Sequence, residues 1–137
     1  MNTAFLELSS DNYLKKLVIS PEQLIALTSN SPLEWVEKSD IAILLTHHDV
    51  SWYDEQSTGY YNNDINPEST FYNHLCGHLH KANAFESGIL GSELRRIQLA
   101  PSLFGLQKIN NKIDRIHGYY AGSYVLNDEE ITEKFYP

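Results

Sequence analysis

Two histidine-rich stretches carry the chemistry that this sequence could perform. One is Cys76-Gly77-His78-Leu79-His80, and the other, about thirty residues upstream, is Thr46-His47-His48-Asp49. In an extended segment, residues two apart point to the same face, which separates the side chains of His78 and His80 by roughly 6.6 Å along the chain. Metal–imidazole bonds are about 2 Å long, and the ions of a two-metal hydrolase lie about 3.5–4 Å apart. The pair therefore suits two adjacent metal ions, with one imidazole for each.

An apolar strand is predicted directly before the first histidine cluster. Asp40–Thr46 is apolar at almost every position, as expected for a strand that is buried on both faces. It ends in His47-His48, and polar groups at the carboxyl end of a buried strand are where α/β proteins tend to build sites. A lone His-His pair is more often part of a surface turn. The second histidine pair, with its ligand spacing, favours the site.

The second cluster is predicted to follow a short helix and a strand. Pro67–His74 is typical of a helix with Asn66 as its N-cap, and Leu75-Cys76 is expected to begin the strand. This interpretation makes His74 a surface or capping residue, and the cysteine a small buried hydrophobe. Gly77, which has no Cβ, is expected to allow a tight turn in front of the ligands.

The other elements are read from periodicity and capping. Trp52–Pro67 is rich in Tyr, Asn and Asp, shows no periodicity, and is predicted to be a long loop. Its aromatic residues either wall a pocket or, more commonly, pack the loop down. A helix is predicted from Pro21 to about Ser29, with Ser20 as N-cap and Gln23 completing a capping box. Strands are predicted at Thr3–Leu8, Leu17–Ile19, Leu94–Ala100 and Ile116–Leu126, the last of them antiparallel and half exposed.

Length and composition limit the kind of protein that could carry these motifs. With 137 residues, of which 42% are hydrophobic, we expect a single folded domain, 1–137. The formal charge of −8 and a pI near 5.1 provide no basic surface, which disfavours nucleic acid and membranes as partners. One cysteine forms no internal disulfide, and neither a signal peptide nor an apolar span of eighteen residues is present. We therefore expect a cytoplasmic protein.

In their order along the chain, these motifs resemble the C-terminal half of a calcineurin-like metallophosphoesterase domain. Ile41–His48, Cys76–His80 and Ala100–Gly105 carry the resemblance, which runs from about Asn2 to the end. It implies an α/β (α+β) fold, namely half of a two-sheet sandwich with a mixed sheet and flanking helices. It also implies divalent metal ions, manganese, iron or zinc, and hydrolysis of phosphate esters. By position, the metal ligands would be His47, His78 and His80. His48 matches no fixed ligand of the family and is left as a group that could hydrogen-bond to a ligand.

The chain lacks the motifs that the first half of such a domain contributes. No Asp is followed two residues later by His, no Gly is followed by Asp, and Asn73-His74 has no preceding Gly. In the family, these motifs supply the bridging aspartate and the histidine that protonates the leaving group. Two cations a few ångströms apart repel strongly without a bridging carboxylate. Three imidazoles are therefore expected to hold at most one ion, weakly, and no catalytic residue is assigned to this chain.

Two hypotheses of different classes follow. In the first, the chain is the metal-ligand half of a phosphoesterase that acts on a phosphate ester only when the other half is supplied. In the second, it is a non-catalytic binding or regulatory module, which pairs with itself or with an intact homologue through an uncovered sheet edge. The acidic composition disfavours long polyanions as substrates, whereas the tyrosines of segment 52–67 could stack on a base.

Overall fold

The computed structural model describes the central sheet, the helices before it and the hairpins after it. For 83–87, 105–109, 112–116 and 135, only the course of the backbone is described. The described residues are 1–5, 7, 9, 12–67, 70–77, 83–87, 95–100, 105–109, 112–116, 118–119, 121–127 and 130–136.

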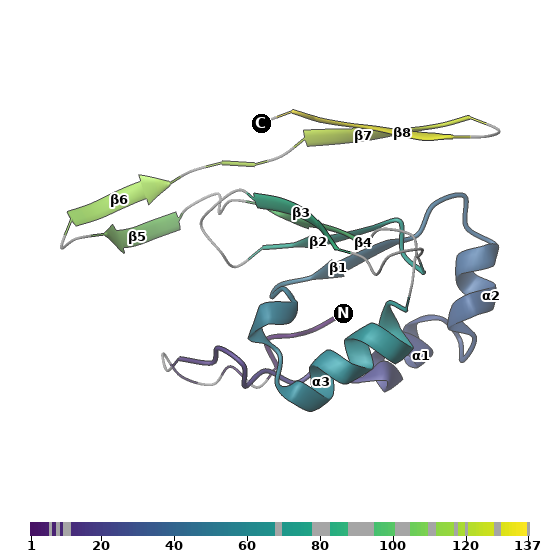
Figure 1. The fold of residues 1–137 in the computed structure, drawn as a ribbon, viewed down its shortest axis with the longest axis horizontal. Helices are drawn as coiled ribbons and strands as arrows, with labels where there is room; N and C mark the ends of the chain where they lie inside the picture. The colour runs from purple at the N-terminus through teal and green to yellow at the C-terminus, as the bar shows by residue number, and fades with distance from the viewer. Residues whose placement is uncertain are drawn as a thin grey trace.

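A four-stranded sheet forms the centre of the fold (Figure 1). Three strands, β1 (Ile43–Thr46), β2 (Asn73–Cys76) and β4 (Arg95–Leu99), are parallel, and β3 (Asn83–Ser87) pairs antiparallel with β4. The spatial order is β1-β2-β4-β3. The last residue of β1, Thr46, lies opposite the last residue of β2, so both strands finish at the same end of the sheet.

A helical layer lies on one side of this sheet, and the main hydrophobic core fills the space between them (Figure 1). The helices are α1 (Pro21–Leu27), α2 (Pro32–Glu37), η1 (Val50–Trp52), α3 (Glu55–Tyr60) and the π-helical turn η2 (Tyr61–Ile65). The buried core residues are Leu17, Ile19, Leu24, Ala42, Leu44, Tyr53, Tyr61, Ile65 and Phe71.

The start of α1 follows the predicted capping in part. The Ser20 side chain accepts a hydrogen bond from the Glu22 backbone, as expected of an N-cap. The predicted capping box is not formed, because the Gln23 side chain exchanges two hydrogen bonds with the backbone of Asn2 and not with that of Ser20. The helix ends at Leu27, two residues earlier than predicted.

The segment predicted to be a long loop, Trp52–Pro67, is mostly helical. Aspartates act as N-caps there: Asp49 accepts from Ser51 N and Asp54 from Ser57 N, each at 2.7 Å. These helices show no apolar periodicity because each is only one or two turns long. Capping side chains, rather than a long apolar face, mark where they begin. Of the two roles predicted for its aromatic residues, walling a pocket or packing the segment down, the buried tyrosines have the second, since they lie in the core.

Two more predicted elements are wrong near the site. The segment Thr3–Leu8 is not a strand at its described positions, because a turn forms from Ala4 to Glu7 and the Thr3 hydroxyl bonds to His48. Likewise, Asn73 and His74 belong to β2 and not to a helix. Backbone pairing with β1 on one side and β4 on the other outweighs the local helix signal there.

The strand predicted at Asp40–Thr46 is present as β1, but it is buried on one face only. Leu44 is 3% exposed and packs toward the helices, whereas Leu45 is 61% exposed. Of the other predicted strands, Leu94–Ala100 corresponds to β4 over its described residues, and Leu17 forms only an isolated bridge with Tyr53.

Two antiparallel hairpins complete the described chain. One pairs β5 (Gly105–Ile109) with β6 (Lys112–Ile116), and the other pairs β7 (Ala121–Leu126) with β8 (Ile131–Tyr136). The predicted strand Ile116–Leu126 is confirmed over Ala121–Leu126, which is β7 and antiparallel, but it is not continuous, since residues 118 and 119 belong to neither β6 nor β7. The β7–β8 hairpin lies over the face of the sheet opposite the helices (Figure 1).

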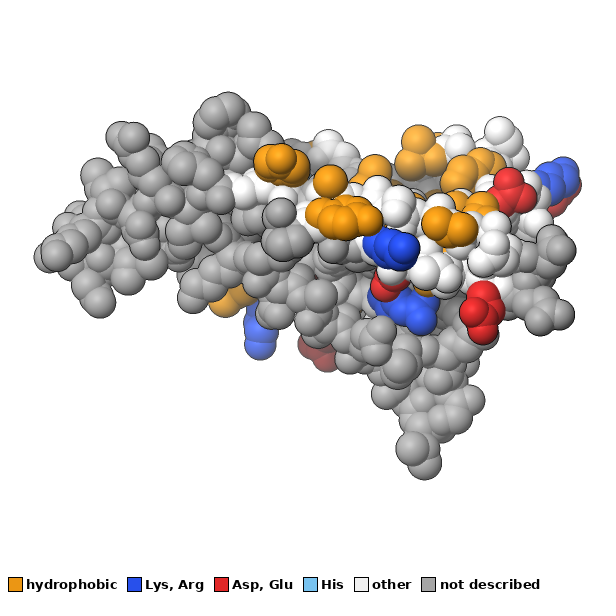
Figure 2. All heavy atoms as spheres, turned by 90° about the horizontal axis from the view of Figure 1, so that it is seen from above, with side chains coloured by type: hydrophobic (Ala, Val, Ile, Leu, Met, Phe, Trp, Pro, Cys, Tyr) orange, Lys and Arg blue, Asp and Glu red, His pale blue; other side chains and the backbone are white. Residues whose placement is uncertain are grey.

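A tyrosine joins this hairpin to the sheet. The Tyr72 hydroxyl donates to the Ile131 carbonyl at 3.3 Å, and its ring meets the Tyr124 ring edge to face at 5.7 Å between centroids. The face that carries the hairpin also displays hydrophobic side chains (Figure 2). The fold is thus mixed α/β, with a largely parallel sheet and flanking helices. In the part of the chain that is described, no helix is long and apolar enough to cross a membrane.

Candidate functional site

The two histidine motifs meet at the end of the sheet where β1 and β2 finish. The Gly77 amide donates a hydrogen bond to the His47 carbonyl at 3.1 Å. A Cβ placed on Gly77 would lie 3.8 Å from Nδ1 of His47. His47 therefore borders the residue that immediately precedes His78. His78 and His80 themselves lie outside the described residues, so the three-histidine ligand set stays a prediction.

Gly77 keeps the space beside the His47 ring open. It has no positive φ, so the expected need for a glycine-only backbone is not what the structure shows here. The relevant property is the absence of a side chain, because a Cβ at this position would already be in van der Waals contact with Nδ1 of His47. His47 is itself exposed, so its imidazole is accessible to a ligand from solvent.

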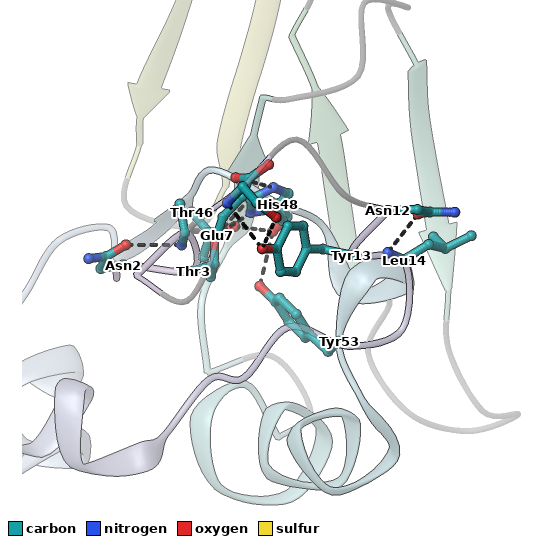
Figure 3. Close-up of polar contacts among 11 residues, drawn as sticks. Asn2, Thr3, Glu7, Asn12, Tyr13, Leu14, Thr46, His48 and Tyr53 are labelled. Carbon is teal, nitrogen blue, oxygen red and sulfur yellow. Dashed lines mark hydrogen bonds and ion pairs between the residues drawn. The ribbon is translucent and has the colours of Figure 1, made fainter.

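His48, the next residue, is fully buried against the N-terminal segment (Figure 3). Its backbone amide donates to the Thr3 hydroxyl at 3.0 Å, and its Nδ1 lies 3.2 Å from the same oxygen. On the other side of the ring, Nε2 lies 3.6 Å from a carboxylate oxygen of Glu7. This arrangement favours hydrogen on Nε2 and acceptance of the Thr3 hydrogen by Nδ1. The rings of His47 and His48 are perpendicular, with centroids 4.6 Å apart.

Two hydroxyl groups donate to the carbonyl of His48. The Thr46 hydroxyl lies 2.6 Å from this oxygen and the Tyr53 hydroxyl lies 3.0 Å from it (Figure 3). A carbonyl has two lone pairs, so both donors can be accepted at once. Burial raises the pKa of Tyr53, so its hydroxyl keeps its hydrogen at any physiological pH.

His74 is not the surface or capping residue that was predicted. It is fully buried in β2, with Nε2 2.7 Å from the Thr46 hydroxyl and Nδ1 3.0 Å from the Tyr61 hydroxyl. Burial lowers the pKa of His74 to about 4, an effect that the charge of Asp49 opposes only in part. The ring is therefore neutral at physiological pH. Cys76, two residues further along β2, is buried as predicted.

The thiol of Cys76 is protonated at neutral pH. Desolvation raises its pKa to about 12, and its sulfur faces the Gln98 carbonyl at 3.7 Å. Among the residues that the structure describes, no group of three or more His, Cys, Asp or Glu side chains is placed to hold a metal ion. The described part of the site therefore offers one accessible imidazole with a buried polar support behind it.

Sequence reasoning missed that support. Its members are spread over the N-terminal segment, β1, β2 and segment 53–66, and residues of these types are common in any fold. The available signal was weak: a threonine directly before His47, and a histidine four residues before His78. The supporting side chains are Thr3, Thr46, Tyr53, Tyr61, Asn66 and His74.

Comparisons of this chain with protein-family models, with curated proteins and with solved structures found no match.

Proposed function

We propose that this chain supplies the His47, His78 and His80 side of a divalent metal centre in a hydrolase that acts on phosphate esters. The observation that supports it is the contact between His47 and Gly77 at the shared end of two parallel strands. Residues that are thirty apart in sequence are thereby adjacent in space, as a site built from both motifs requires. The ordered motifs of the sequence supply the reaction class.

The residues present fit a metal ion of intermediate softness. Imidazole nitrogen is a good ligand for zinc, iron and manganese, and His47 has an accessible ring whose Nδ1 side is not covered by a side chain at position 77. When bound, such an ion would polarise a phosphate oxygen and lower the pKa of a bound water. The chain's own histidines would hold the ion in place.

A bridging carboxylate is missing from the motifs of this chain. Without one, a second cation a few ångströms away would be repelled by the first. The proposal therefore includes one weakly bound ion and no phosphate-ester hydrolysis by this chain alone. Completion of the site would require carboxylate ligands from another polypeptide segment.

Titration of the purified chain with Mn²⁺, followed by the loss of the free-ion signal in electron paramagnetic resonance, tests the proposal. We expect one site. His47→Ala, His78→Ala and His80→Ala should each weaken binding by about tenfold or more, because each removes a ligand. His117→Ala is the matched control, a histidine outside both motifs, and should leave binding unchanged.

Two results would contradict this function. Absence of Mn²⁺ binding, or binding that is indifferent to His47→Ala and His78→Ala, would remove the metal centre. Hydrolysis of an aryl phosphate by the chain alone, abolished by His78→Ala, would keep the centre but overturn the claim that it is incomplete.

A second candidate function is a protein-binding module that pairs with itself. Exposed apolar side chains on the hairpin favour it, since Val125 and Leu126 are 46% and 44% exposed and Tyr136 is 57% exposed. Figure 2 shows hydrophobic side chains gathered on that face. Contiguous exposed apolar surface is typical of a protein interface.

A further inference from the structure

The backbone that carries His47 is held at three successive polar groups. The His47 carbonyl accepts from Gly77, the His48 amide donates to Thr3, and the His48 carbonyl accepts from two hydroxyl groups. The peptide groups on both sides of His48 are thus fixed by Gly77, Thr3 and Tyr53 from other segments and by Thr46 from the end of β1. A side chain on such a backbone has fewer orientations to lose when it binds a ligand.

One of these partners, the Thr46 hydroxyl, has its direction set by its neighbours. A carbonyl oxygen has no hydrogen to donate, so the hydroxyl must donate to the His48 carbonyl, 2.6 Å away. Having a single hydrogen, it can then only accept from Nε2 of His74, 2.7 Å away. Geometry alone therefore assigns the hydrogen of neutral His74 to Nε2.

The other side of the His74 ring agrees with this assignment. Nδ1 is left as an acceptor, and the Tyr61 hydroxyl donates to it at 3.0 Å. The Tyr61 oxygen in turn accepts from the side-chain amide of Asn66 at 3.0 Å. These hydrogen bonds form one buried series, which runs from Tyr61 in η2 through His74 in β2 to Thr46 at the end of β1.

We propose that Thr46 and His74 are positioning residues for His47. His74 donates to Thr46, which orients the Thr46 hydroxyl toward the His48 carbonyl, and this bond holds the turn in which His47 faces Gly77. Neither residue contacts the metal ion in this scheme. This role of Thr46 and His74 rests on the proposed function, in which His47 is a metal ligand.

Amide hydrogen exchange measured by NMR tests the proposal without a metal. The reporter is the Gly77 amide, which bonds to the His47 carbonyl, and the internal reference is the Ala100 amide, which bonds to Cys76 at 2.9 Å. In Thr46→Val, which keeps the side-chain shape but loses the hydroxyl, Gly77 should exchange about tenfold faster relative to Ala100. In Thr46→Ser, which keeps the hydroxyl, the ratio should stay near that of the unmodified chain.

The nitrogen spectrum of the unmodified chain provides a second test that needs no variant. His74 should show a protonated Nε2 and an unprotonated Nδ1. A hydrogen on Nδ1 would overturn the proposal, even if Thr46→Val failed to fold. An unchanged ratio of Gly77 to Ala100 exchange in Thr46→Val would overturn it as well.

Titration with Mn²⁺ separates this inference from the proposed function. If both hold, Thr46→Val weakens Mn²⁺ binding by about tenfold and Thr46→Ser restores it. If the unmodified chain binds no Mn²⁺ but Gly77 exchange accelerates in Thr46→Val, the proposed function is rejected and the positioning of the turn by Thr46 is supported. If Mn²⁺ binds equally to the unmodified chain and to Thr46→Val, and Gly77 exchange is unchanged, the metal site is supported and the positioning role of Thr46 is rejected.

Discussion

His47 and His48 are adjacent and chemically identical, yet their environments are opposite. His47 is exposed beside Gly77, whereas His48 is buried between Thr3 and Glu7. Both residues lie in the bend that follows β1, where the N-terminal segment covers the ring of His48 and leaves His47 at the surface. The accessible ring is the candidate ligand, and the buried ring anchors the N-terminal segment.

His74 should make the stability of the protein depend on pH. Its pKa is lowered to about 4 in the folded state, from an ordinary value near 6.5, so the unfolded chain takes up a proton first as the pH falls. The free energy of unfolding should therefore decrease between about pH 6.5 and pH 4, by up to about 3 kcal/mol from this residue.

Urea denaturation at a series of pH values measures this effect. His74→Gln can still donate to Thr46 but does not titrate, so the difference in stability between the two proteins should change across that pH window. Parallel curves for the two proteins would mean that His74 is not held neutral by burial.

At the scale of elements, the position of the site follows from how β1 and β2 pair. Parallel strands in register finish at the same end of the sheet, and the residues just beyond them, His47 and Gly77, are then neighbours. An antiparallel pairing of the same strands would have placed the two motifs at opposite ends. The helical layer adds two tyrosines to the buried hydrogen bonds next to the site: Tyr61 from η2, and Tyr53 from the residues between η1 and α3.

The one-sided burial of β1 predicts different costs for neighbouring leucines. Leu44→Ala should destabilise the fold by about 2–4 kcal/mol, because it leaves a cavity between the sheet and the helices. Leu45→Ala, the matched control on the exposed face, should cost less than about 0.5 kcal/mol. Thermal or urea unfolding of both variants checks this, and equal costs would show that the face of Leu45 is covered in solution.

At the scale of the whole molecule, the two sides of the sheet are covered differently. Helices and a core lie on one side, and a two-stranded hairpin lies over the other (Figure 1). The net charge of −8 keeps copies of the chain apart unless an apolar contact overcomes the repulsion. Association through the hairpin should therefore strengthen when salt screens that charge.

Sedimentation velocity over a wide range of concentration tests the self-pairing candidate. We expect the unmodified chain to associate as its concentration rises, and Val125→Lys to shift it toward the monomer. Leu27→Lys is the matched control, since Leu27 is 67% exposed but lies on α1, on the helical side. A monomer at every concentration, or an equal effect of both variants, would argue against pairing through the hairpin.

Local patterns predicted the strand that leads into the site, whereas the ligand set that includes His78 and His80 stays a prediction. An apolar run that ends in His47-His48 predicted a strand with a histidine at its carboxyl end, and β1 has that form. The N-cap at Ser20 was readable because capping needs only residues a few positions apart. The helices of segment 52–67 escaped prediction because three short turns have too few residues to establish a period.

The side chains that follow the strands, the acidic charge and the lack of a bridging carboxylate motif can all be read from the sequence. The burial and neutrality of His74, and the bond between His48 and Thr3, 45 residues away in sequence, could not be read from it and depend on how the chain packs. The physical reason is that burial and hydrogen-bond partners depend on which segments pack together, and alternation along one strand carries no information about its neighbours.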